Sequence, residues 1–231
     1  KEEGFLKGVK AVSQLKLRLS AGMTGQQDGI AEYAHLARYT LSTEPKERYP
    51  MGDAGWQFLY TPAAYDPSIK WETTTTYNVG VDFGFLNDRI TGNVDAYLRN
   101  TKDLLNEVQT PMGSNFGNKL LTNIGSLQNK GIEFGLNFIP VQTNDWHLSI
   151  GVNGTFQNTK FTKLNSTDDE NFYMDASWLS GTGRVLGRHH VGDAPYSYYV
   201  FQQLYDSEGM PIQNAFVDRN DDGKINDADR Y

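Results

Sequence analysis

Two long stretches of alternating apolar and polar residues, Trp71 to Leu86 and Arg89 to Thr101, follow each other almost without a break. Alternation with a period of two is typical of a β-strand that has one apolar face and one polar face. The tight corner at Asn87 and Asp88 predicts that the two strands form a hairpin. Strands of soluble proteins average about five or six residues. Because these strands are roughly two to three times longer, their length suits a membrane.

The same alternation returns in three other parts of the chain, so that five strands are expected near residues 13–24, 71–86, 89–103, 129–140 and 146–161. The connections alternate between short turns and the long stretches 25–70, 104–128 and 162–231. In a transmembrane barrel the apolar residues face lipid, the polar residues face the lumen, and the long loops lie outside the cell. We therefore predict an all-β fold, in which residues 1–231 are an antiparallel transmembrane β-barrel segment with long extracellular loops.

Composition is compatible with this interpretation and excludes two other classes. The 231 residues contain no apolar run long enough for a transmembrane helix. The formal net charge of -7 argues against a nucleic-acid partner, because binding to phosphates needs a basic surface. The absence of cysteine from the sequence removes disulfide and thiol chemistry.

Long loops outside the cell fix a direction for every strand, and with it the environment of each tryptophan. Trp71 is expected near the outer membrane interface and Trp146 near the periplasmic one, where aromatic girdles lie. Packing in the core of a soluble sandwich is the alternative role for these two side chains. The residues predicted to face lipid are Val79, Val81, Phe83, Val94, Ile132, Phe134, Leu136, Ile150 and Val152.

The strongest local chemical motif is the acidic stretch from Asp218 to Asp229. Its spacing matches a calcium-binding EF-hand loop, with oxygens at positions one, three and five, a glycine at six, a backbone carbonyl at seven and a carboxylate at twelve. The corresponding metal ligands are Asp218, Asn220, Asp222, Lys224 through its carbonyl, and Asp229. We expect a structural Ca²⁺ here and no catalytic cofactor. The alternative is a surface turn rich in Asp and Asn that binds no metal.

Other candidate groups are assigned ordinary roles. The lumen carboxylates Glu72, Asp82, Asp95 and Glu133 are expected to bond to Arg, Lys or neighbouring strands. His189 and His190 beside Asp193 are expected to be solvated loop residues, since adjacent side chains on an extended chain point in opposite directions. We find no set of nucleophile, base and orienting group, so no catalytic residue and no enzyme activity is predicted.

Aromatic residues are frequent in the predicted loops. Such rings can stack on sugars or on apolar side chains, and they can equally pack the loops against one another or against a partner. The candidates are Tyr33, Tyr39, Trp56, Tyr60, Phe116, Tyr173, Trp178, Tyr196, Tyr198 and Tyr199.

An ordered series of short runs resembles the barrel of SusC/RagA-type TonB-dependent transporters and covers nearly the whole chain. Each run is weak alone, and their succession is specific. The runs are Leu15 to Ser20, Lys70 to Thr74, Asp82 to Phe85, Thr101 to Leu105, Leu121 to Gly125, Asn129 to Phe134, Val191 with Gly192, Pro195 to Ser197, and Val217 to Gly223.

The resemblance implies a plugged barrel of the 22-stranded kind in the outer membrane of a Gram-negative bacterium. It also implies energy from a TonB complex and a SusD-like surface lipoprotein acting as a lid. Because nothing in the chain looks like the plug or the final strands, we expect a carboxy-proximal piece of a longer protein.

The function implied is import of a bulky nutrient, an oligosaccharide first and an oligopeptide second, between which the sequence does not choose. The alternative from another class is a secreted calcium-stabilised β-sandwich that binds carbohydrate. The long unbroken alternations oppose it, because a sandwich needs short strands with frequent turns.

Overall fold

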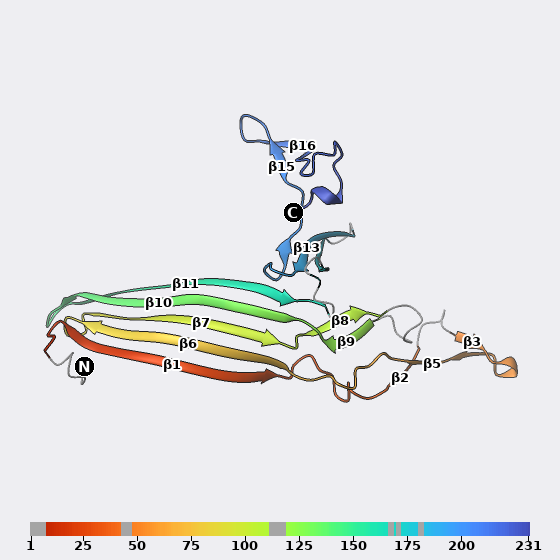
Figure 1. Cartoon of the computed structure of the whole chain (residues 1–231), viewed down its shortest axis with the longest axis horizontal. Coiled ribbons are helices and arrows are strands. Elements are labelled where there is room, and N and C mark those ends of the chain that lie inside the picture. The colour runs from red at the N-terminus through yellow and green to blue at the C-terminus, as the bar shows by residue number, and fades with distance from the viewer. Residues whose placement is uncertain (1–7, 43–47, 111–118, 166–168, 170–171, 180–182) are drawn as a thin grey trace. The chain divides into compact units, whose positions relative to one another are not determined.

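The computed structural model describes residues 8–42, 48–110, 119–165, 169, 172–179 and 183–231, and nearly all regular structure in it is antiparallel β (Figure 1). These described ranges also hold two short 3₁₀ turns, η2 (Gly52–Ala54) and η3 (Asp227–Asp229). No helix within these described ranges has the length and apolarity needed to cross a membrane. The predicted all-β, antiparallel fold class is therefore confirmed.

Five long strands form one sheet in the order β1-β6-β7-β10-β11. Their bounds are β1 Val12–Gln26, β6 Glu72–Phe85, β7 Ile90–Lys102, β10 Ser126–Gln142 and β11 His147–Lys163. Each lies over one of the five predicted stretches, and β1, β10 and β11 run beyond the predicted ends. The sequence-adjacent pairs β6·β7 and β10·β11 are the two predicted hairpins, and β1 completes the other side of β6.

The register aligns apolar residues of neighbouring strands in rows. One row runs from Leu17 to Val81, Val94 and Phe134, each directly opposite the next. Since side chains alternate between the two faces of a sheet, a row of this kind fixes the face of every other residue in these strands. The sheet therefore has one largely apolar face and one largely polar face.

The turn between β6 and β7 is built from residues in the left-handed conformation. Leu86, Asn87 and Asp88 have φ of 54°, 55° and 64°. Asn and Asp tolerate this region because their short polar side chains bond to the local backbone, whereas a leucine there is uncommon. The amide of Asp88 also donates to the hydroxyl of Ser13, 3.0 Å away, which attaches the turn to β1.

Short two- or three-stranded sheets fold within the long connections. In the first connection β2 (Tyr39–Leu41) pairs with β5 (Tyr60–Pro62), and β3 (Arg48–Pro50) pairs with β4 (Trp56–Phe58). Sequence-adjacent strands β8 (Leu105–Gln109) and β9 (Lys119–Asn123) pair in the second. The third holds a sheet of β12 (Tyr173–Leu179), β13 (Arg184–His190) and β14 (Ser197–Tyr198), and a hairpin of β15 (Gln203–Tyr205) and β16 (Pro211–Phe216).

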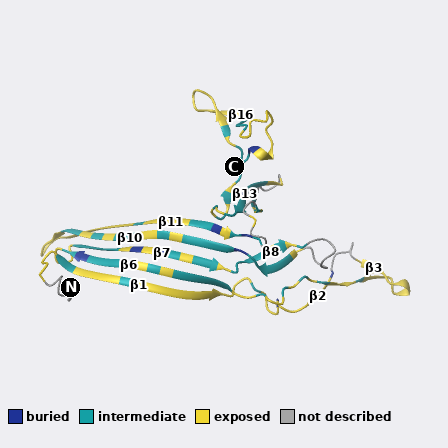
Figure 2. Cartoon of the chain, viewed as in Figure 1, coloured by how far each residue is buried: buried dark blue, intermediate teal, exposed yellow. Residues whose placement is uncertain are grey.

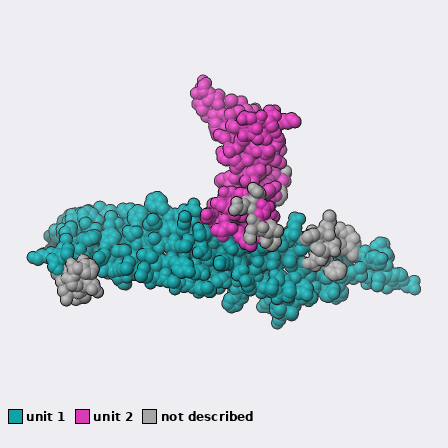
Figure 3. Space-filling model, in the orientation of Figure 1, with its two compact units in different colours: residues 1–158 teal, residues 159–231 magenta. Residues whose placement is uncertain are grey.

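The chain divides into two compact units, Lys1–Asn158 and Thr159–Tyr231, which are coloured separately in Figure 3. Most residues of β1 and β11 are exposed, whereas exposed residues are interspersed with partly covered and buried ones along β6, β7 and β10 (Figure 2). Within the described ranges the buried hydrophobic residues are Ala34, Tyr97, Phe161 and Leu164. The apolar face of the long sheet is thus exposed among the described residues of this unit, as expected for a surface that meets lipid.

Candidate functional site

The outward face of the long sheet is a continuous apolar surface. Leu19, Val79 and Ile132, which share one cross-strand row, are 70%, 50% and 51% exposed. The register of β1, β6, β7 and β10 places the predicted lipid-facing residues of these strands on this one face. The space above Gly154 of β11 is taken by the Phe134 ring, which shows that even-numbered residues of β11, including Ile150 and Val152, share the same face.

Two tryptophans end this apolar face at opposite edges of the sheet. Trp71 precedes β6 at the edge where β1 and β7 end, and its ring covers Gly25. Trp146 precedes β11 at the edge where β10 ends, and it is 76% exposed. The structure therefore separates the two rings along the strands, which is the arrangement that a pair of aromatic girdles requires.

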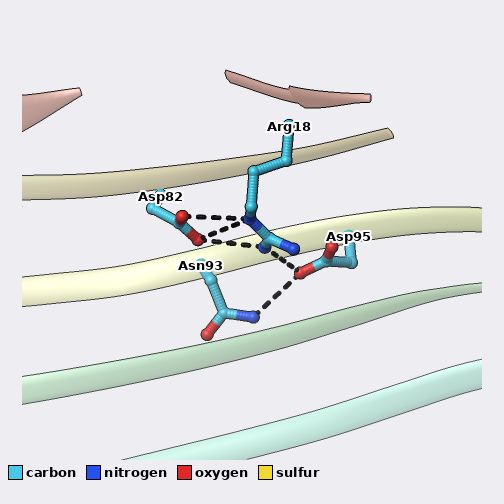
Figure 4. A network of polar contacts seen from close by, with 4 residues as sticks. All are labelled: Arg18, Asp82, Asn93 and Asp95. Atoms are coloured by element: carbon cyan, nitrogen blue, oxygen red, sulfur yellow. Dashed lines mark hydrogen bonds and ion pairs between the residues drawn. The ribbon is translucent and has the colours of Figure 1, made fainter. Parts of the chain in front are cut away.

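The inward face carries a polar network that spans three strands (Figure 4). The Nε of Arg18, from β1, donates to both carboxylate oxygens of Asp82, from β6, at 3.1 and 3.0 Å. Its Nη2 donates to Oδ2 of Asp95, from β7, at 2.7 Å, and Asn93 donates to the same oxygen at 3.0 Å. The prediction that these lumen carboxylates bond to arginine is borne out for Asp82 and Asp95.

Glycine at position 80 is what lets this network cross the middle strand. A Cβ on Gly80 would lie 2.3 Å from Oδ1 of Asp95 and 2.8 Å from Nη2 of Arg18. Any side chain there would therefore occupy the space through which Arg18 reaches from β1 to β7. Oδ1 of Asp95 has no hydrogen-bond partner among the described residues, and it lies where a side chain at position 80 would begin.

Aromatic rings cover other glycines of the sheet in the same way. On the outward face Phe83 of β6 lies over Gly92 of β7, where a Cβ would be 2.7 Å from the ring. On the inward face the buried Tyr97 lies over Gly131, and its hydroxyl donates to Gln157 at 3.5 Å. Each ring gains apolar contact that a larger residue would prevent, so these glycines are packing positions.

A second polar cluster ties the end of the first connection to the β8·β9 hairpin. The hydroxyl of Thr122 donates to Oδ2 of Asp66 at 2.5 Å, and Asn123 accepts the amide of Lys70 at 2.7 Å. The ammonium of Lys70 lies 3.0 Å from Asp103. Hydrogen bonds from Ser68 first, and from Thr122 next, hold the pKa of Asp66 below its ordinary value. Two loops distant in sequence are thereby held together.

The predicted calcium loop folds back on its own backbone. Asp218 accepts the amides of Asp222 and Gly223 at 3.3 and 2.7 Å, and Asp222 accepts the amide of Lys224 at 2.8 Å. Asp229 is completely buried, and its two oxygens accept the amides of Arg219 and Asn226 at 2.9 and 2.8 Å. These backbone bonds, that of Asn226 foremost, lower the pKa of Asp229 and keep it ionised.

Whether calcium fits this loop is decided by where the acidic oxygens point. The side-chain amide of Asn220 donates to Oδ2 of Asp222 at 3.1 Å, so this oxygen is engaged in a hydrogen bond within the loop. Over the described parts of the chain, no three His, Asp or Glu side chains gather closely enough to hold a metal ion. The loop has the oxygen donors that Ca²⁺ needs, and the ion would have to draw them together.

The C-terminal unit contains stacked arginines that no sequence pattern indicates. Tyr199 lies between the guanidinium groups of Arg188, at 3.9 Å, and Arg230, at 4.5 Å. Arg230 also donates to the carbonyl oxygens of Val185 and Tyr199. Cation–π partners distant in sequence carry no periodic signal, so this stack was not anticipated.

The loop aromatics fall into two groups. Tyr199 packs between arginines as described, whereas most of the other described rings are well exposed; these are Tyr33, Tyr39, Trp56, Tyr60, Tyr173, Tyr196 and Tyr198. Phe116 lies outside the described residues, and the side chain of Trp178 is likewise not described. Tyr39, Trp56, Tyr60, Tyr173 and Tyr198 stand on short strands of the loops, whereas Tyr33 and Tyr196 lie in turns.

Fold and surface together define a segment of a transmembrane β-barrel wall. The family model "TonB dependent receptor-like, beta-barrel" matches residues 12–227. All of the chain aligns with 23% of the TonB-dependent receptor SusC of Bacteroides thetaiotaomicron at 46% identity. Receptor P26 of Formosa agariphila is 29% identical over 99% of the chain and 23% of its own length.

Solved structures agree on the fold. "Structure of the RagAB peptide transporter" matches 90% of this chain and 23% of its own with a TM-score of 0.66 and 24% identity. The chain belongs to the TonB-dependent receptor β-barrel family and is of the SusC/RagA type. It spans about a quarter of the length of these relatives.

Proposed function

We propose that this chain is part of the barrel of an outer-membrane transporter that imports a bulky nutrient with energy from a TonB complex. The observation that carries the proposal is the five-stranded sheet with its uncovered apolar outer face and its Arg18 network on the polar inner face. That division of surfaces is what a water-filled or plugged barrel in lipid requires. Family membership supports the same function. A SusD-like surface lipoprotein is the proposed partner.

We propose an oligosaccharide as the first candidate substrate and an oligopeptide as the second. The exposed rings of Tyr33, Trp56 and Tyr60 support the first, since aromatic faces stack well on sugar rings. The second is supported by the similarity in fold to RagAB, which is described as a peptide transporter. The long loops that carry these rings are the proposed extracellular part.

Uptake by cells tests the proposal directly. Cells that carry the complete protein should accumulate a fluorescent oligosaccharide, and a protonophore should stop accumulation because the inner-membrane proton gradient drives TonB. Cells without the gene are the control for leakage. Accumulation of labelled oligopeptide instead would reverse the order of the two substrates. Accumulation of neither, with the protein shown to be folded in the membrane, would contradict import.

We also propose, on the spacing of Asp218, Asn220, Asp222, Lys224 and Asp229, that the C-terminal acidic loop takes a structural calcium ion. The completely buried and ionised Asp229 supports this role. It anchors the C-terminal end of the loop, and its position there is that of the last calcium ligand.

A further inference from the structure

His189 of β13 is held between two aromatic rings at the end of a membrane strand. The ring of Phe161, in β11, lies 4.9 Å away at 66°, and that of Tyr196 lies 4.7 Å away at 70°. The Nδ1 atom of His189 accepts the backbone amide of Tyr196 at 3.2 Å. The expectation of a solvated loop histidine is therefore wrong for His189, because the turn that follows β13 folds back over its side chain.

The turn from Val191 to Ser197 is attached to β11 through the backbone around this histidine. Phe161 donates its amide to Asp193 at 3.0 Å and accepts the amide of Gly192 at 2.8 Å. Tyr196 adopts a left-handed φ of 59°, which is unfavourable for a tyrosine and needs support from its surroundings. The bond from its amide to His189 supplies part of that support.

The neighbouring His190 makes a different kind of contact, since its Nδ1 lies 3.1 Å from Oδ2 of Asp193. Nδ1 of His189 instead accepts the backbone amide of Tyr196. A proton on Nδ1 of His189 removes the acceptor that holds this amide.

Burial disfavours the charged form of His189 and lowers its pKa from the ordinary 6.5. Charged side chains also lie on the elements near the ring, but the lowered pKa of His189 is caused by burial. They are Lys160 and Lys163 on β11, Asp175 on β12, Arg188 and His190 on β13, and Asp193 in the turn. Arg188 is stacked on Tyr199, and Asp193 faces His190.

We propose that residues 191–197 form a pH-sensitive latch in which neutral His189 holds the turn against the end of β11 and protonated His189 releases it. Because the folded form lowers the pKa, the stabilising contribution of His189 is complete above about 6.5 and falls as the pH drops below it. Mild acid should therefore loosen the turn, while the five-stranded sheet keeps its structure.

A spin label in the turn tests the latch in the complete protein. The chain has no cysteine, so Ala194→Cys gives a single labelling position in this segment, and Ala194 is exposed. On lowering the pH from about 7.5 to about 5, the mobile fraction of the spectrum should rise in the protein with native histidines. In His189→Gln, whose side-chain oxygen accepts the amide without titrating, the spectrum should stay the same.

His190→Gln is the matched control and should keep the response of the native turn. Folding of each variant is checked by the heat-modifiable migration of the barrel, and His189→Asn replaces His189→Gln if the latter does not fold. A native spectrum that does not change with pH would overturn the latch. So would a pH response that persists without His189, or one that disappears when His190 alone is replaced.

Discussion

In this protein, adjacent residues of one strand lie on opposite faces of the sheet and meet different environments, as Val81 and Asp82 of β6 show. Val81 lies in the apolar row between Leu17 and Val94, whereas Asp82 bonds to Arg18 on the other face. The difference of one residue therefore changes the medium from lipid to the polar lumen. The period of two that is visible in the sequence has this physical meaning.

Val81→Arg should impair barrel assembly far more than Asp82→Asn. An arginine on the lipid face costs about 2 to 4 kcal/mol at the bilayer midplane, while an asparagine on the polar face still accepts a hydrogen bond from Arg18. The measurement is the amount of heat-modifiable folded barrel in outer membranes that contain the complete protein. Equal losses in the two variants would show that β6 is oriented differently.

Gly80→Ala should destabilise the barrel by about 1 to 3 kcal/mol, the range for leaving a buried donor or acceptor without its partner. The new methyl group would displace Asp95 or Arg18 from the network. Gly22→Ala is the matched control, because Gly22 also lies on the inward face and a Cβ there meets nothing within 4 Å. Urea unfolding of both variants in lipid vesicles gives the comparison, and equal stability would show that the network tolerates a side chain at position 80.

Calcium should protect the acidic loop against proteolysis. The carboxylates of Asp218, Asp221, Asp222 and Asp227 repel one another without a cation, and extracellular calcium sites bind with dissociation constants of about 0.1 to 1 mM. Titration of the complete protein should reduce cleavage over this range, and the Asp218→Ala/Asp222→Ala variant should not respond. A cleavage pattern that ignores calcium at several times these concentrations would identify the motif as a simple turn.

At the scale of elements, the two ends of the strands differ in the length of the connections that they carry. The turns after β6 and β10 hold a few residues each, while the other connections are long enough to fold small sheets of their own. Bonds between Asp66 and Thr122 and between Lys70 and Asn123 join two of these connections. The first and the second long connection are therefore held together.

An epitope tag inserted after Gly209, in the turn between β15 and β16, should be reached by antibody on intact cells. A tag after Asp88, in the turn between β6 and β7, should be reached only after the outer membrane is permeabilised. Long loops lie outside and short turns face the periplasm in barrels of this class. Labelling in the reverse order would invert the assigned direction of all five strands.

At the scale of the whole molecule, β1 and β11 are the outermost strands of the long sheet as far as it is described. Their outer edges carry backbone N–H and C=O groups that need hydrogen-bond partners from other strands inside the membrane. Each unpaired group there costs several kcal/mol. The 231 residues alone should therefore fail to give a heat-modifiable barrel in vesicles, in which the complete protein succeeds. Insertion of the isolated chain as a stable monomer would show that these edges need no partner.

The sequence by itself determined the strands, their two faces and the family, because a period of two and a succession of local runs are properties of neighbouring residues. It also located Asp82 and Asp95 on the polar face. Tertiary structure decided which partners meet. Arg18 reaches Asp95 across Gly80, and His189 lies between Phe161 and Tyr196, since contacts between segments distant in the chain follow from register and from the path of the loops.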